Sequence, residues 1–104
     1  MDLAAELVVE KGIQVGKIFK ISTDITTIGR PGSRQNDIPL LDETVSRKHA
    51  SIVYDEEKDH YILVHEGSTN PTRLNSEVVV KPRILKDDDI IRVGHTVFRF
   101  KLGK

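Results

Sequence analysis

The chain has 104 residues, 38% hydrophobic and 31% charged, which fits one globular domain of the soluble class. Lysine plus arginine equals aspartate plus glutamate, at 16 each, so the chain lacks the basic excess of a duplex nucleic-acid binder. It has no cysteine, which excludes disulfides and thiolate metal sites. No apolar run is long enough to cross a bilayer or act as a secretory signal, so we expect no membrane contact and a cytoplasmic location.

Residues 1–5 are expected to form a flexible tail, and residues 6–104 a single domain. Short β-branched or alternating runs follow, bounded by glycine and polar turn residues, and this pattern favours strands. One of these runs contains Pro39, which cannot donate to a ladder, so that strand belongs at a sheet edge. The strands expected in the N-terminal half are 7–10, 17–22, 25–28, 38–40 and 48–54.

The C-terminal half continues in the same style, and its phenylalanines Phe98 and Phe100 alternate with polar residues, as core positions of a strand do. The strands expected here are 60–65, 72–74, 78–80, 84–85, 90–93 and 96–102. Roughly ten or eleven short strands without a helix of normal length predict an all-β sandwich or barrel. The pattern alone does not choose between the two.

A cluster of phosphate-binding groups is expected where two of these strands end. Arg30 follows the 25–28 strand and Gly29, and a loop rich in turn formers, 31–37, comes next. Ser46 and Arg47 stand just before the 48–54 run. If the two strand ends meet, two rigid forks of donors and one hydroxyl converge, which suits a dianionic phosphate.

The motifs Gly29-Arg30, Ser46-Arg47-Lys48-His49 and Ser68-Thr69-Asn70, in this order and spacing, resemble a forkhead-associated (FHA) domain over nearly the whole chain. Segments 16–21 and 85–94 are similar to the early hairpin and the late turn of that family. The resemblance implies a sandwich of two antiparallel sheets with binding loops at one end. It also implies a non-catalytic module that recognises a threonine-phosphorylated protein or peptide in Ser/Thr kinase signalling, without a cofactor.

The resemblance further implies roles for single residues. Arg30 and Ser46 would contact the phosphate, and Arg47 would add a further contact. Thr69 and Asn70 would touch the phosphothreonine and the peptide main chain, a role that an amide can fill because it both donates and accepts. We expect the domain to act as a monomer.

His49 stands three residues after Ser46, which raises a catalytic alternative. In an extended segment, however, positions an odd number apart point to opposite faces. The resemblance instead implies that His49 and Gly29 support the site structurally. Two alternatives stay open: an interaction domain of the same fold that ignores phosphorylation, and a small hydrolase using Ser46 and His49.

The chain departs from the family at Pro71, where the family favours glycine after Asn70. Proline fixes its own φ and pushes the preceding residue toward extended conformations. Asn70 is then either held in a peptide-ready pose or turned off the site, and we expect the second. Elsewhere, the 87–89 aspartates lack the spacing of a calcium loop and the histidines lack that of a zinc site, so no metal is expected.

Overall fold

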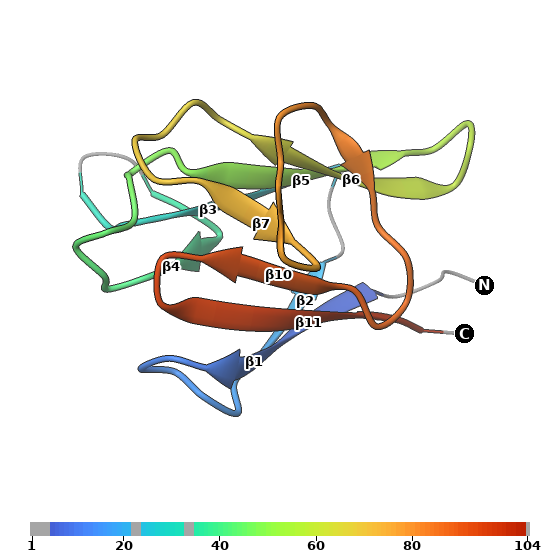
Figure 1. Cartoon of the computed structure of the whole chain (residues 1–104). Coiled ribbons are helices and arrows are strands. Elements are labelled where there is room, and N and C mark those ends of the chain that lie inside the picture. The colour runs from blue at the N-terminus through green and yellow to red at the C-terminus, as the bar shows by residue number, and fades with distance from the viewer. Residues whose placement is uncertain (1–4, 22–23, 33–34, 104) are drawn as a thin grey trace.

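The structure, a computed structural model, describes residues 5–21, 24–32 and 35–103. These ranges contain eleven strands and no helix (Figure 1). No helix in them could therefore cross a membrane. The strands are β1 (Ala5–Lys11), β2 (Ile18–Ile21), β3 (Ile25–Gly29), β4 (Ile38–Pro39), β5 (Ala50–Asp55), β6 (His60–His65), β7 (Thr72–Leu74), β8 (Glu77–Val78), β9 (Arg83–Ile84), β10 (Ile90–Val93) and β11 (Thr96–Leu102).

The strands form two sheets that pack face to face, which confirms the all-β sandwich. One sheet has six strands in the order β2-β1-β11-β10-β7-β8, and the other has five in the order β4-β3-β5-β6-β9. The expectation of purely antiparallel sheets is wrong at one place, because β4 pairs with β3 in parallel. The loop after β3 turns back far enough for Ile38 and Pro39 to lie opposite Ile28 and Gly29, the last residues of β3, and β4 then runs in the same direction. As expected, Pro39 lies in an edge strand.

The bounds of β6, β7, β10 and β11 are as predicted, and the ends of the other strands differ from the predicted ones by at most two residues. One difference of two residues is at the N-terminus, where β1 begins at Ala5, a residue that was expected in the tail. Ala5 is fully buried and pairs with Ile21 and Leu102, so it is part of the sheet. The expected tail residues 1–4 lie outside the described residues. The strand predicted over 48–54 begins at Ala50 as β5, so His49 precedes the strand.

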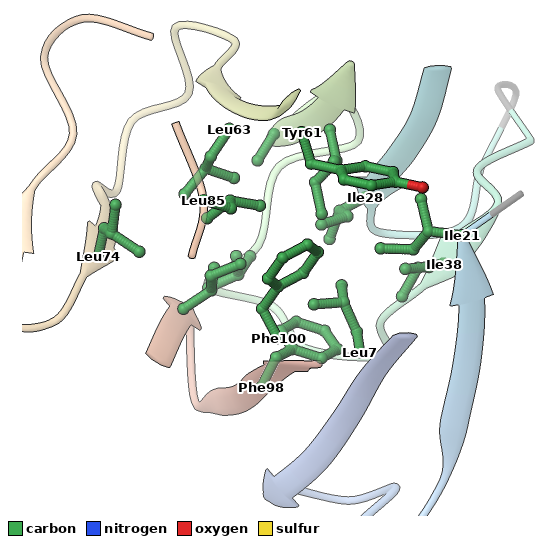
Figure 2. Close-up of a cluster of buried hydrophobic side chains, with 14 of the residues drawn as sticks. Leu7, Ile21, Ile28, Ile38, Tyr61, Leu63, Leu74, Leu85, Phe98 and Phe100 are labelled. Carbon is green, nitrogen blue, oxygen red and sulfur yellow. The ribbon is translucent and has the colours of Figure 1, made fainter. Parts of the chain in front are cut away.

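The core lies between the two sheets (Figure 2). Phe98 and Phe100 on β11 are fully buried and alternate with partly exposed residues, as the sequence predicts. The rings of Phe100 and Tyr61 lie 5.6 Å apart between centroids and connect β11 of one sheet to β6 of the other. Burying such a side chain contributes about 1.5–3 kcal/mol, so these rings fix how the sheets sit on each other.

The loops that carry the candidate site residues lie at one end of the sandwich. The connections that follow β3, β4 and β6 lie at the left in Figure 1, together with the β10–β11 turn. The β5–β6 turn lies at the opposite end.

Candidate functional site

Arg30 follows β3 directly and is joined to the β4–β5 loop by its own backbone and side chain. Its backbone N–H donates to the Ser46 carbonyl at 3.0 Å, and its Nε donates to the Val45 carbonyl at 3.1 Å. The side chain is half-buried. Its two Nη atoms have no hydrogen bond with any described residue. The two strand ends that the sequence predicts to meet are therefore in contact, and the guanidinium keeps its terminal donors free.

Gly29 lies where the chain can hold no side chain. A Cβ at this position would overlap the backbone carbonyl of Arg47. That same carbonyl accepts a hydrogen bond of 2.8 Å from Nδ2 of Asn36, which also reaches the Arg30 carbonyl at 3.3 Å. Asn36 was expected in an exposed loop, yet it is half-buried and ties that loop to the next.

Arg47 is exposed, and its side chain lies along the loop that Arg30 begins. A Cβ added to Gly32 would lie 2.7 Å from Nε of Arg47, so this glycine leaves room for the arginine. No described acidic side chain forms an ion pair with Arg47 or Arg30. A second guanidinium is thus available beside the first.

His49 is fully buried and holds the turn that carries Ser46. The Ser46 backbone N–H donates to Nδ1 of His49 at 3.1 Å, so the neutral ring carries its proton on Nε2. Burial is the main cause that lowers the pKa of His49, and the Pro71 carbonyl near Nε2 partly opposes it. Nε2 has no hydrogen bond of good geometry there. The ring of His65 packs edge-on at 5.7 Å, with Nδ1 2.9 Å from Thr72 Oγ1.

The β6–β7 loop reaches the same end of the molecule through Asn70. Its Nδ2 donates to the Thr44 carbonyl at 2.8 Å, and Ser68 Oγ donates to the Asn70 carbonyl at 2.8 Å. This contact keeps Asn70 beside the β4–β5 loop. Thr69 is exposed, and its side chain makes no hydrogen bond to the described residues.

Asp42 anchors the β4–β5 loop, a role that the sequence did not reveal. One of its oxygens accepts from the backbone N–H and the hydroxyl of Thr44, at 2.9 and 2.6 Å, and the other from the His95 N–H at 2.8 Å. Burial alone raises the pKa of Asp42, but these hydrogen bonds outweigh it and lower the pKa to about 2. Gly94 allows the approach, because a Cβ there would lie 2.6 Å from Asp42 Oδ2.

The arrangement therefore presents two guanidinium groups, two hydroxyls and one amide at one end of a rigid sandwich. Such a set can bind an anion and a neighbouring peptide backbone. In the described part of the chain, no three histidine, aspartate or glutamate side chains are grouped as metal ligands. Hydrogen bonds connect Ser46 directly to Arg30 and His49, Arg47 to Arg30 through Asn36, and Asn70 to Thr44, whereas no hydrogen bond between described residues joins Thr69 to the others.

The sequence model of the FHA domain family matches residues 26–94. The chain is 36% identical over 100 residues to the glycogen accumulation regulator GarA of Mycobacterium tuberculosis, covering 96% of this chain and 59% of that protein. It is 30% identical over 97 residues to the human angiogenic factor with G patch and FHA domains 1, covering 86% of this chain and 14% of that protein. The chain thus spans only part of each curated relative.

A solved structure from a structural and functional analysis of phosphothreonine-dependent FHA domain interactions has the same fold. It superimposes with a TM-score of 0.83 at 27% sequence identity, over 97% of this chain and 98% of that one.

Proposed function

The chain belongs to the FHA domain family, and from this premise we propose that it recognises threonine-phosphorylated proteins in Ser/Thr kinase signalling, without catalysing a reaction. The observation that carries the proposal is the contact between Arg30 and the carbonyls of Val45 and Ser46, which joins the end of β3 to the loop that carries Ser46 and Arg47. Neither guanidinium forms an ion pair with a described residue. A location in the cytoplasm, where ATP-dependent kinases act, belongs to the same proposal.

The chemistry of the cluster matches a phosphate. Phosphothreonine carries a charge of about −1.5 to −2 and three acceptor oxygens, which calls for several converging donors. Arg30 is held at Nε by a carbonyl, so its terminal donors are oriented before the ligand arrives. Pre-orientation lowers the entropy cost of binding. Asn70, whose Nδ2 donates to the Thr44 carbonyl, would contact the peptide main chain beside the phosphate.

The hydrolase alternative, with Ser46 as nucleophile and His49 as base, finds no support in this geometry. A base must reach the hydroxyl proton of the nucleophile. Nδ1 of His49 instead accepts the backbone N–H of Ser46, and Nε2 faces Pro71.

Calorimetric titration with a threonine-phosphorylated peptide library and its unphosphorylated twin tests the proposal. We expect binding only to phosphorylated peptides, with no turnover. Arg30→Ala should weaken it about 10- to 100-fold, because hydrogen bonds to charged groups contribute about 1.5–3 kcal/mol. Lys58→Ala, which removes an exposed cation in the turn at the far end, is the matched control.

Equal affinity for the two libraries would instead identify an interaction domain that ignores phosphorylation. Release of inorganic phosphate or a cleaved peptide would identify an enzyme. Unchanged affinity in a folded Arg30→Ala protein would remove Arg30 from the site.

A further inference from the structure

Arg73 and Arg92 face each other on the outer surface of the six-stranded sheet. They are directly opposite in the register of β7 and β10. Both side chains are exposed, whereas their strand neighbours Thr72, Leu74 and Ile91 are buried. Like charges directly opposite each other destabilise a strand pair. The fold therefore keeps two positive charges side by side at a cost to its own stability.

Neither arginine is neutralised by a described acidic side chain. Among the described residues, Arg73 donates only to the Ser76 carbonyl at 3.4 Å, and Arg92 only to the Gly94 carbonyl at 3.3 Å. Both distances are long for a hydrogen bond. On the same face Arg99 pairs with Glu10 at 2.6 Å, so ion pairing is readily available to this sheet. In the described part of the chain the two arginines thus remain without an ion pair, although Arg99 and Lys101 on the same sheet are paired.

The two arginines line a hollow of about 410 Å³ that adjoins the candidate site. Asn70 and Thr44, the hydrogen-bonded pair that joins the site loops, also line it. His95 also lines it. The nearby carboxylate of Asp42 is already occupied by three hydrogen bonds, two of them to Thr44 and one to His95. A ligand that lies across Asn70 can therefore enter a pocket with unsatisfied positive charge.

We propose that this hollow binds a second anionic group of the phosphorylated partner, carried on the same peptide segment as the phosphothreonine. This inference rests on the proposed function. A carboxylate and a second phosphate share the required chemistry, since each can accept two parallel donors from a guanidinium fork. An extended segment advances about 3.3 Å per residue, so the second group lies within a few residues of the phosphothreonine.

The test is an acid scan along a phosphothreonine peptide with uncharged flanks. One series places a single glutamate at each position on either side of the phosphothreonine, and a second series places phosphoserine at the same positions. Binding to the wild type is compared with Arg73→Gln/Arg92→Gln by fluorescence anisotropy. Lys20→Gln/Lys58→Gln, which removes two exposed charges elsewhere, is the matched control.

We expect glutamate at one or two positions to strengthen wild-type binding about tenfold, the size of one charged hydrogen-bonding contact. The gain should fall below about twofold in the double variant and persist in the control. A response to phosphoserine alone would identify the second group as a phosphate. Arg92→Glu should move the preference at that position from glutamate to lysine.

A scan with no responsive position, or a gain that survives in the double variant, would overturn the inference. The proposed function is read separately from the same data. The proposed function stands if the phosphothreonine peptide with uncharged flanks binds the double variant as well as the wild type. It fails if that peptide binds no better than its unphosphorylated form.

Discussion

Arg99 and Lys101 on β11 each form an ion pair, whereas Arg30 and Arg47 at the loop end form none with the described residues. Arg99 lies 2.6 Å from Glu10, and Lys101 lies 2.7 Å from Asp88. Hydrogen bonding to Glu10 and Asp88 raises the pKa of both cations. The two cations on β11 are therefore paired with acidic side chains of the protein itself.

The loop end is held together by other means. Neutral side chains bind backbone groups there: Asn36 holds the Arg47 carbonyl, His49 holds the Ser46 N–H, and Asn70 holds the Thr44 carbonyl. Asp42, the acid that anchors the β4–β5 loop, accepts hydrogen bonds from Thr44 and the His95 N–H and forms no ion pair with either arginine, so the two guanidinium groups remain available for a ligand. The same sandwich therefore uses its positive charges in ion pairs on β11 and leaves two arginines without ion pairs at the loop end.

The largest effect should follow from removing His49, since it is the buried one of the three neutral side chains that hold the loop end. His49→Ala leaves a cavity and an unsatisfied Ser46 N–H, and we expect a loss of about 3 kcal/mol in unfolding free energy. For a domain of this size that corresponds to a melting temperature lower by roughly 10 °C or more. His60→Ala, in the half-exposed start of β6, is the control and should melt nearly normally. Normal melting of His49→Ala would mean that the loops are held without it.

Arg47 and Arg99 should give opposite results when each is changed to alanine. Arg47→Ala should weaken phosphopeptide binding about tenfold with no change in melting temperature, because it removes one unpaired charge. Arg99→Ala should leave binding unchanged and slightly lower the melting temperature, since it breaks the pair with Glu10. The two proteins are compared by titration and by thermal melting. A loss of binding in Arg99→Ala would show that the two regions are not independent.

Much of the fold could be predicted because it depends on local alternation. The burial of Phe98 and Phe100 and the bounds of β6, β7, β10 and β11 follow from a period of two and from turn residues. The start of β1 at Ala5 could not be predicted, because alanine has weak β propensity and its place is set by pairing with Ile21 and Leu102. The parallel direction of β4 depends on the path of a loop, which no periodicity encodes.

Part of the candidate site could be identified from the sequence. Arg30, Ser46 and Arg47 are recognisable by type and spacing, and the structure joins the segments that carry them. The residues that hold them, Asn36 and Asp42, gave no signal beyond being polar turn formers. Their contacts span 11 residues in one case and 53 in the other, so they appear only once the chain is folded.

The contribution of Asp42 to the stability of the loop end depends on pH. Its pKa falls from 3.8 to about 2 in the folded chain, so its stabilising contribution is present above about pH 4 and is lost as the pH falls toward 2. After a discount for solvent screening, we expect this contribution to be about 1 kcal/mol. Asp42→Asn should lower stability by that amount at pH 7 and remove this part of the acid sensitivity. Urea titrations at pH 7, 4 and 3 measure it, and equal acid sensitivity in the two proteins would contradict it.

The smallest effect concerns Pro71. Its replacement tests whether the proline holds Asn70 in a position that favours peptide binding. The hydrogen bond to the Thr44 carbonyl keeps Asn70 beside the β4–β5 loop, and we expect Pro71 to help hold it there. Asn70→Ala should then weaken phosphopeptide binding about fivefold, the size of a neutral hydrogen bond. Pro71→Gly should weaken it about threefold, because a freer loop must be ordered on binding. A double-mutant cycle, measured by titration, should show that Pro71→Gly matters little once Asn70 is alanine, since the proline acts through that side chain. Tighter binding by Pro71→Gly would mean that the proline restrains Asn70 away from the ligand and that the contact with Thr44 competes with recognition.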